Sequence, residues 1–334
     1  MKQTSVLLVN VGTPDSHSLK DVRRYLSQFL NDRRVITLPA VLRKILVNGI
    51  IIPFRTRKSS KLYKQLWTEK GSPLLYYSQE LVLKLQQELG ESFKVCLAMR
   101  YGNPSLDNVL NKAKATNPDE IIIVPLYPQY ASSTTGSVFE AIMNKIKHWE
   151  IIPGIKLINQ FYGQPEFIKA FKNQIESYNP DKYDHILFSY HGLPLDHIKQ
   201  VHPSEQIEEC TCINEMTAHG KFCYRAVCYE TTRLLVKELN ISSNRFSVGF
   251  QSRLSKNWLT PFSDEVVKEL AEKGVKKLLV VAPSFVTDCL ETIIEIQEEY
   301  HELFLSNGGE ELTLVKSLNS NDIWSQALAK IIQV

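Results

Sequence analysis

The chain has 334 residues, of which 43% are apolar and 22% charged, and its formal net charge is +3. This length allows one large domain or two of ordinary size, and the small net charge argues against a nucleic-acid partner. Because no run of about eighteen uncharged apolar residues occurs and the N-terminus lacks a signal-peptide pattern, we expect a cytoplasmic protein without a membrane span.

The first half of the chain alternates short apolar runs with longer helical patterns, which is typical of a parallel sheet covered by helices. We predict strands over residues 6–12, 95–100 and 121–125, and helices over 106–114 and around 139–142. Prolines or glycines follow the strands closely and mark where they end.

An apolar segment, residues 36–54, interrupts this rhythm after the first strand. Charges at Arg43 and Lys44 exclude a membrane span. One interpretation is a buried helical hairpin. The other is an exposed apolar lip for a large flat ligand, which could also rest on a membrane surface, with the basic residues that follow it meeting acidic groups of the ligand.

The second half of the chain repeats the pattern of the first. Strands are predicted over 185–192, 247–253 and 278–283, with helices over 263–273 and around 293–296. Because proline and arginine landmarks match in order, we predict an internal duplication that gives two similar Rossmann-like lobes, each a parallel sheet flanked by helices. We place the lobes at residues 1–165 and 166–334, with a lip over about 36–60, and expect a ligand-binding cleft between them.

His191 stands at the carboxyl end of the strand 185–192, within Ser189-Tyr190-His191-Gly192. Open α/β sheets bind ligands at this edge, and a neutral imidazole is suited to proton transfer or metal binding. A satisfied structural histidine is the alternative interpretation.

Four of the six cysteines form the pattern C-x-C-x10-C-x4-C within an insert at about 203–228; they are Cys210, Cys212, Cys223 and Cys228. Disulfides are rare in a reducing compartment, so the cluster predicts a metal site first. An iron–sulfur cluster, a structural zinc ion and free thiols all remain open.

Glu291, Glu295 and Glu299 recur every four residues after the last strand. On an α-helix this spacing places the three carboxylates on one face, about 6 Å apart per step. Like charges in such a file repel unless they are solvated, protonated or bridged by cations. A solvated acidic face and a metal path are therefore both compatible with the pattern, and Asp288 fits a helix cap.

Together these stretches resemble the ferrochelatases over nearly the whole chain. Residues 188–194, FSYHGLP, resemble the family's histidine motif, and residues 283–292, PSFVTDCLET, resemble its glutamate signature. Family-like stretches also occur at residues 10–14, 71–73 and 127–136. The resemblance implies an enzyme that inserts Fe²⁺ into protoporphyrin IX, with release of two protons, in the last step of haem synthesis. The alternatives are a chelatase for coproporphyrin III or another tetrapyrrole, and a non-catalytic haem carrier.

The resemblance implies that His191 and Glu291 are catalytic and face each other across the porphyrin, and that Glu295 and Glu299 continue the metal path. It also implies a set of porphyrin contacts: Val11, Arg55, Arg57, Tyr63, Ser72, Arg100, Tyr130, Ser132, Ser133 and Trp258. Coproporphyrin-using members usually carry tyrosine in place of Val11, so protoporphyrin IX is the expected substrate.

Some members carry a [2Fe–2S] cluster, and the cysteine segment resembles the internal four-cysteine insert of certain bacterial members. The resemblance therefore favours a cluster held by Cys210, Cys212, Cys223 and Cys228. A peripheral contact with the inner face of a membrane is compatible with the lip. The sequence predicts no oligomeric state.

Overall fold

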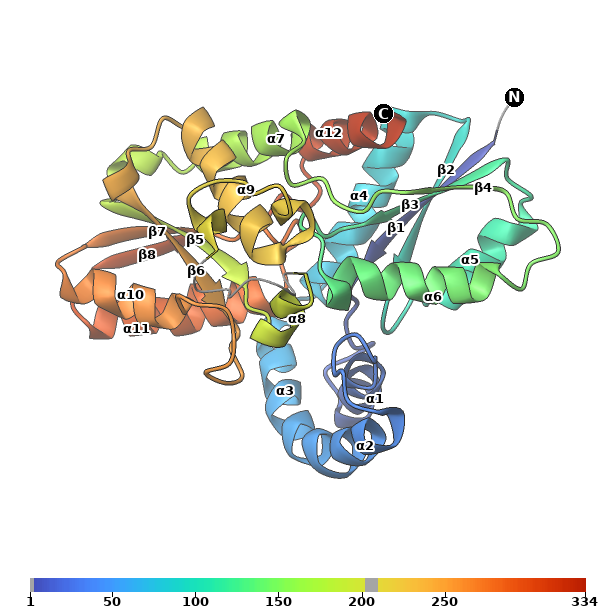
Figure 1. Ribbon diagram of the computed structural model, residues 1–334, viewed down its shortest axis with the longest axis horizontal. Coiled ribbons are helices and arrows are strands. Elements are labelled where there is room, and N and C mark those ends of the chain that lie inside the picture. Colours follow the sequence, from blue (N-terminus) through green and yellow to red (C-terminus); the bar gives the residue numbers. More distant parts are fainter. Residues whose placement is uncertain (1–2, 202–209) are drawn as a thin grey trace. The chain divides into compact units, whose positions relative to one another are not determined.

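A computed structural model describes residues 3–201 and 210–334 of the chain (Figure 1). It divides into two compact units. The first comprises Met1–Tyr127, Ala131–Gln160 and Ser320–Val334, and the second comprises Pro128–Tyr130 and Phe161–Asn319. The predicted first part of the cysteine insert falls largely on residues 202–209, which lie outside the described residues.

The first unit is built on a four-stranded parallel sheet in the order β2-β1-β3-β4. Its strands are β1 (Thr4–Asn10), β2 (Phe93–Met99), β3 (Glu120–Pro125) and β4 (Gly154–Leu157). Its helices are α1 (Leu19–Leu30), α2 (Ala40–Ile45), the π-helix η1 (Leu46–Ile51), α3 (Ile52–Leu66), α4 (Pro73–Leu89), α5 (Leu106–Ala115), the π-helix η2 (Ser132–Gly136), α6 (Ser137–Ile146) and α12 (Asp322–Gln333).

The second unit is built on a parallel sheet in the order β6-β5-β7-β8. Its strands are β5 (His185–His191), β6 (Phe246–Gln251), β7 (Lys277–Val281) and β8 (Glu311–Leu314). Its helices are α7 (Pro165–Glu176), α8 (Leu195–Lys199), α9 (Tyr224–Glu238), α10 (Ser263–Glu272), the π-helix η8 (Glu291–Tyr300) and α11 (His301–Ser306), and short 3₁₀ turns occur at Pro180–Lys182, Thr211–Ile213, Gly220–Phe222 and Ser243–Arg245.

The two sheets have the same strand order, with β5, β6, β7 and β8 taking the places of β1, β2, β3 and β4. In each unit the first strand is central and pairs with the two strands that follow it in the chain. The predicted fold of two similar lobes is confirmed, and the shared order is what an internal duplication produces. The short edge strands β4 and β8 were not predicted, because four residues give too little alternation to be recognised.

The central strands are apolar throughout because both faces of each sheet are covered. In the first unit β1 is buried along its whole length, and Leu7 and Ile123 pack against α5 and α6 through Leu110 and Ile142. In the second unit Leu187, Leu278 and Val280 form the equivalent core with α10 and η8. These rigid sheets fix the strand ends at which the polar side chains stand.

The observed units differ from the predicted lobes 1–165 and 166–334 at three places: residues 128–130 and 161–165 belong to the second unit, and the C-terminal residues belong to the first. Residues 320–334 belong to the first unit, because α12 packs against α4. Trp324 is completely buried, and the Lys84 ammonium pairs with the Asp322 carboxylate at 2.6 Å. The alternation of strands and helices carries no information about which sheet a final helix joins.

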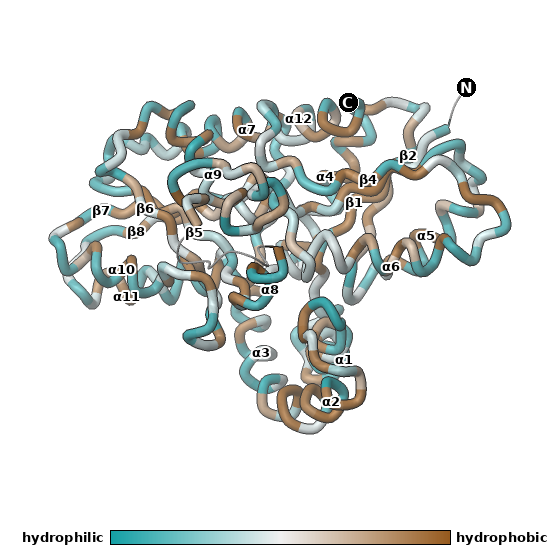
Figure 2. Tube along the Cα trace, viewed as in Figure 1, coloured by the Kyte–Doolittle hydropathy of each residue, from teal (hydrophilic) through white to brown (hydrophobic). Residues whose placement is uncertain are grey.

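Most of the apolar segment is exposed, so the buried hairpin is wrong, and the lip that faces a ligand or a membrane stays a prediction. Figure 2 shows the apolar character gathered along α2 and the helix that follows it. The exposed fraction is 81% for Phe54 and 70% for Val41, and Leu42, Ile45 and Ile50 are exposed as well. None of the helices in the described part of the chain has the length and apolar character that a membrane span requires.

Candidate functional site

The strand β5 carries His191 to its carboxyl end, where the parallel register sets His191 opposite Gln251 of β6. The backbone of His191 is held from two sides. Its N–H donates to the Ser284 hydroxyl at 3.3 Å, and its carbonyl accepts from the Tyr224 hydroxyl at 2.9 Å. His191 is therefore fixed at the sheet edge by its backbone, while its side chain is only partly buried.

The His191 imidazole meets the edge of the Phe285 ring, with centroids 6.1 Å apart and planes at 81°. Its Nδ1 is buried and has no hydrogen-bond partner within residues 3–201 and 210–334. A buried polar atom without a protein partner is costly, and a catalytic role or a bound water or ion accounts for such atoms. For Nδ1, the structure therefore does not support the alternative of a structural histidine whose hydrogen bonds are all made within the protein.

Gly192 allows the chain to turn closely after His191. A Cβ atom there would lie 2.7 Å from the Gln251 carbonyl oxygen and 3.3 Å from the Trp258 ring. Any side chain would push β5 and β6 apart or displace Trp258. The structure thereby brings two predicted site residues, His191 and Trp258, to neighbouring positions.

The carboxylate helix is a π-helix over Glu291–Tyr300 rather than the predicted α-helix. π-Helical segments occur frequently at functional sites. The expected Asp288 cap is wrong as well. Instead, Thr292 Oγ1 accepts from the Cys289 N–H at 2.9 Å.

Asp288 anchors the start of this helix to the chain beyond β8. Its carboxylate accepts from the Ser317 N–H at 3.0 Å and from the Asn319 side-chain amide at 2.7 Å. Asn319 in turn accepts from the Asp288 N–H at 2.8 Å. This reciprocal pair is buried, so the helix that carries the glutamates begins at a fixed place.

The three glutamates have different surroundings. Glu295 accepts hydrogen bonds from Ser252, Gln251 and Tyr300. Burial raises the pKa of the Glu295 carboxyl, and the hydrogen bonds from Ser252 and the charge of His191 offset this rise only in part.

Glu291 and Glu299 are less constrained. Glu291 is half-buried and shares a hydrogen bond with the Cys289 thiol, and Glu299 is exposed. Within the described ranges neither forms a salt bridge. Carboxylates without cationic partners at a strand end can accept a proton or bind a divalent cation.

In the first unit the loop after β1 carries Val11, which is partly buried. Gly12, at φ +105°, follows it, and a Cβ atom there would overlap the Tyr101 carbonyl oxygen. Ser72 is buried, and its hydroxyl accepts from the Thr13 hydroxyl at 2.9 Å. Val11 and Ser72 thus belong to adjoining loops at the carboxyl edge of this sheet.

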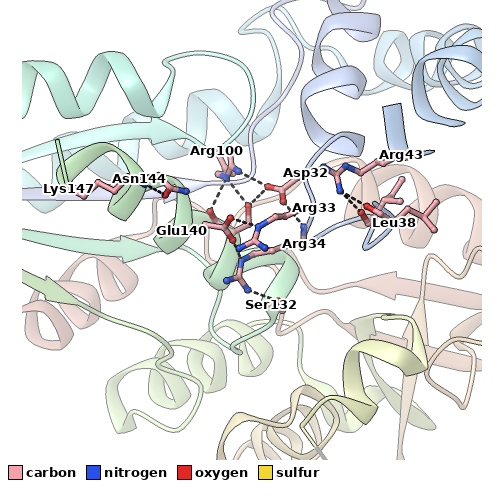
Figure 3. A network of polar contacts seen from close by, with 12 residues as sticks. Asp32, Arg33, Arg34, Leu38, Arg43, Arg100, Ser132, Glu140, Asn144 and Lys147 are labelled. Atoms are coloured by element: carbon pink, nitrogen blue, oxygen red, sulfur yellow. Dashed lines mark hydrogen bonds and ion pairs between the residues drawn. The ribbon is translucent and has the colours of Figure 1, made fainter. Parts of the chain in front are cut away.

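Arg100 lies within a polar network between the end of α1 and the start of α6 (Figure 3). Its guanidinium pairs with Asp32 at 2.6 Å and donates to the Ser137 hydroxyl at 2.7 Å. The side chain predicted to meet a propionate is therefore already paired with a buried carboxylate.

The same network reaches Ser132 through the segment that precedes the lip. The Arg34 guanidinium donates to the Ser132 hydroxyl at 2.8 Å and also pairs with Glu140. Arg33 pairs with the other oxygen of Glu140 (Figure 3). Ser133 is the next residue of the same π-helix.

The remaining predicted porphyrin contacts are dispersed. Arg55 and Arg57 are exposed on α3, whereas Tyr63 of the same helix is buried against the edge of Tyr25 at 6.1 Å. Tyr130 belongs to the second unit, where its ring meets the edge of Phe222 at 6.0 Å.

The cysteines gather at the start of α9. Cys212 shares side-chain hydrogen bonds with Cys223 and Cys210, and the Arg225 guanidinium donates to the Cys212 sulfur at 3.2 Å. The hydrogen bond from Cys212 lowers the pKa of the Cys223 thiol, whereas burial raises the pKa of Cys228. In the described part of the chain no three or more histidine, cysteine or acidic side chains form a metal-binding group.

Sequence reasoning missed the residues that hold the predicted ones in place, chiefly Gln251, Ser252 and Tyr300 in the second unit and Asp32 and Arg34 in the first. One signal was available for Gln251 and Ser252. The duplication matches the end of β6 with the end of β2, so both residues could have been placed at a strand end beside His191.

The chain is similar to known proteins over its full length. The sequence model of the family "Ferrochelatase" matches residues 3–334. The chain is 44% identical over 329 residues to the "Ferrochelatase" of Legionella pneumophila strain Lens, with 98% of each chain covered. It is 42% identical over 331 residues to the "Ferrochelatase" of Coxiella burnetii strain Dugway 5J108-111, which covers 98% of this chain and 92% of the relative.

Solved structures show the same fold at low identity. SirB from Bacillus subtilis with Fe³⁺ matches with a TM-score of 0.58 and 10% identity, covering 99% of this chain and 94% of that one. The sirohydrochlorin chelatase SirB of Bacillus subtilis subspecies spizizenii, in complex with cobalt, matches with a TM-score of 0.56 and 11% identity over the same shares.

We expect the buried Asp32 to make the stability of the first unit depend on pH. Burial alone would raise the pKa of Asp32, but hydrogen bonds from Ser137 and the Arg34 N–H, with the charge of Arg100, hold it below its ordinary value. This stabilisation is complete above the unfolded-state pKa, about 3.9, and is lost as the pH falls through the lower folded-state pKa.

Asp32→Asn should therefore lower the free energy of unfolding by roughly 2–4 kcal/mol at pH 7, and by progressively less as the pH falls below about 3.9. Urea unfolding across this range measures the difference. Asp107→Asn, which removes an exposed partner of Lys145, is the control and should cost less than about 1 kcal/mol. A loss for Asp32→Asn that stays the same at every pH would contradict the assignment.

Proposed function

The chain belongs to the ferrochelatase family and inserts iron into a porphyrin in haem synthesis, and we propose that its substrate is protoporphyrin IX and that His191 and Glu291 carry the reaction. One observation supports these roles above the others. In the same unit, a strand-end imidazole has a buried Nδ1 without a partner, and Glu291 has no salt bridge within the described ranges. Neither group is neutralised by an ion pair within the described ranges, which supports these roles.

Metal insertion exchanges two protons for one cation. A free porphyrin carries two inner N–H groups, and both protons must leave before Fe²⁺ can bind the four nitrogens. His191 takes one pyrrole proton as a general base, which requires the neutral imidazole. Glu291 holds the iron through a carboxylate oxygen and accepts the second pyrrole proton as the iron passes to the ring nitrogens. Oxygen ligands hold ferrous iron loosely enough to release it, unlike thiolates.

We propose Glu299 as an outer oxygen ligand through which iron reaches Glu291. It lies two helical turns further along η8 and is exposed. We leave Glu295 out of this proposed path, because its oxygens already accept hydrogen bonds from the protein. Its expected place on the path stays a prediction.

For the porphyrin we propose the contacts that the family resemblance implies: Val11, Tyr130, Ser132, Ser133 and Trp258 along the ring. Ser72, Tyr63, Arg55 and Arg57 would meet the propionates. Arg100 is already paired with Asp32, so its guanidinium would meet a propionate only after that pair breaks. Val11, in place of the tyrosine usual in coproporphyrin-using members, favours protoporphyrin IX.

The test is an anaerobic assay of Fe²⁺ insertion with protoporphyrin IX and coproporphyrin III. His191→Ala and Glu291→Gln should each reduce kcat by about 10²-fold or more, which is the usual contribution of general acid–base catalysis, without loss of thermal stability. Glu298→Gln, an exposed neighbour on the same helix, is the matched control and should retain activity.

Near-normal turnover in either variant would remove its assigned role. Preference for coproporphyrin III in the unaltered protein would overturn the substrate assignment, and tight porphyrin binding without insertion would indicate a carrier.

We further propose that Cys210, Cys212, Cys223 and Cys228 hold a [2Fe–2S] cluster. The thiols of Cys210, Cys212 and Cys223 are linked by hydrogen bonds. The Arg225 guanidinium donates a further hydrogen bond to the Cys212 sulfur. Cys223 accepts backbone N–H groups at the start of α9, where the helix dipole favours negative charge. These donors suit anionic sulfur. A bound cluster would supply a covalent brace for this segment.

Protein purified under anaerobic conditions should show the visible absorption of a [2Fe–2S] cluster and contain about two irons and two sulfides per chain. Cys223→Ser should lose both, whereas Cys96→Ser, outside the segment, should keep them. A colourless protein without iron would refute the cluster, and bound zinc in its place would assign a structural zinc site.

We also propose that the lip rests on an anionic membrane surface. The exposed apolar side chains of α2, η1 and the start of α3 include Val41 and Phe54, and the exposed basic residues Arg55, Arg57 and Lys58 follow directly. Apolar side chains beside cationic ones are typical of surfaces that bind acidic headgroups.

The protein should cosediment with phosphatidylserine-containing vesicles more strongly than with neutral phosphatidylcholine vesicles. Val41→Ser with Phe54→Ser should abolish most of this binding, because the membrane contact loses its apolar area. Ile151→Ser, at an exposed apolar side chain elsewhere in the same unit, controls for general stickiness. Equal binding by all variants would refute the proposal.

A further inference from the structure

Ser252 adopts a backbone conformation that is unusual for its residue type. It follows β6 directly and has φ +62°, in the left-handed region that disfavours residues with a Cβ atom. Such conformations persist where the surrounding structure holds them, and they cluster at functional sites.

This conformation aims two donors of Ser252 at the carboxylate of Glu295. The Ser252 N–H donates to Oε1 at 2.6 Å, and the Ser252 hydroxyl donates to Oε2. Tyr300 adds a hydrogen bond to Oε1 at 3.1 Å, and the Gln251 amide adds one to Oε2 at 3.3 Å. Each carboxylate oxygen thus has two protein partners. Since a carboxylate offers about four acceptor positions, those of Glu295 are filled.

The Gln251 amide cannot turn away, because both of its ends are engaged. Its Oε1 accepts from the Ser189 hydroxyl at 2.8 Å, and Ser189 bonds to Ser263 at 2.8 Å. Its Nε2 also donates to the Glu291 carbonyl oxygen at 3.1 Å. The side chains of Gln251, Ser189 and Ser263, which form this series of hydrogen bonds, are all buried. The donors that surround Glu295 are therefore held in place by the core of the second unit.

Glu291, one turn earlier on η8, presents the opposite case. Gln251 donates to the backbone carbonyl oxygen of Glu291 and does not contact the Glu291 carboxylate. That carboxylate shares a hydrogen bond with the Cys289 thiol. Two neighbouring carboxylates on one helix face can together bind one divalent cation. Here the protein occupies one of them and leaves the other available.

We propose that Ser252 is a positioning residue that keeps the Glu295 carboxylate bound to the protein and outside the coordination sphere of the incoming metal, so that Glu291 alone of these two provides the oxygen ligand. This inference rests on the proposed function of Glu291. The affinity of oxygen sites for divalent cations rises with the number of charged ligands. A metal held by both carboxylates would be released to the porphyrin more slowly.

The test compares Ser252→Ala with Ser252→Gly. Both remove the hydroxyl donor, but glycine also relieves the left-handed backbone, so an effect common to both reports the lost hydrogen bond rather than strain. Binding of Co²⁺, an air-stable probe for Fe²⁺, is measured by titration calorimetry without porphyrin. We expect both variants to bind Co²⁺ about tenfold more tightly, the effect of one charge-assisted hydrogen bond.

In the anaerobic assay both variants should show a lower KM for Fe²⁺ and a lower kcat, with the KM for porphyrin and the Tm unchanged. Ser255→Ala, at an exposed serine three residues away, is the matched control. Adding Glu295→Gln to Ser252→Ala should return the Co²⁺ affinity to that of the unaltered protein, because the freed ligand is then removed.

Co²⁺ affinity that is unchanged or weaker in both serine variants would overturn the proposal, and so would a gain that persists after Glu295→Gln. The calorimetric result does not depend on turnover. If the unaltered protein failed to insert iron but the serine variants bound Co²⁺ more tightly, the proposed function would fall while the role of Ser252 stood.

Discussion

The parallel pairing of β5 with β6 is the constraint on which the second unit depends. Its register sets His191 opposite Gln251. One strand end therefore presents the imidazole, and its neighbour presents the amide that bonds to both turns of the carboxylate helix. A register shifted by one residue would turn every side chain of one strand to the other face of the sheet. The base and the carboxylates would then no longer share a site.

The buried polar chain Ser263–Ser189–Gln251 extends this constraint from the core to the site. Buried hydrogen-bonded networks specify one arrangement because any alternative leaves a donor or acceptor unpaired. In the first unit a network of hydrogen bonds and ion pairs joins the segment before the lip to the π-helix that carries Ser132 (Figure 3). Its members are Asp32, Arg34, Arg100 and Glu140. Each unit thus fixes partly buried predicted site residues through hydrogen bonds from neighbouring polar side chains.

The carboxylate file shows why residue spacing is an incomplete guide to function. Glu291, Glu295 and Glu299 look equivalent in the sequence. Their i, i+4 spacing predicted one shared helix face, and the family resemblance implied one continuous metal path. In the structure Glu295 is saturated with hydrogen bonds, Glu299 is exposed, and Glu291 is half-buried without a cationic partner. The donors that create this difference come from β6 and from Tyr300. The four-residue spacing of the glutamates does not indicate which of them accepts hydrogen bonds from the end of β6.

The sequence by itself determined the two-lobed α/β fold, the strand end that carries His191, the helical segment that carries the glutamates, and the family, because apolar runs, punctuating prolines and long motifs are local signals. Only the tertiary structure decided that α12 joins the first unit, that the lip is exposed and that the glutamate helix is a π-helix. It also decided that Glu295 is the carboxylate that accepts hydrogen bonds from the end of β6. These features depend on contacts between residues far apart in the chain, such as Ser252 with Glu295 and Asp32 with Arg100, and no local pattern encodes them.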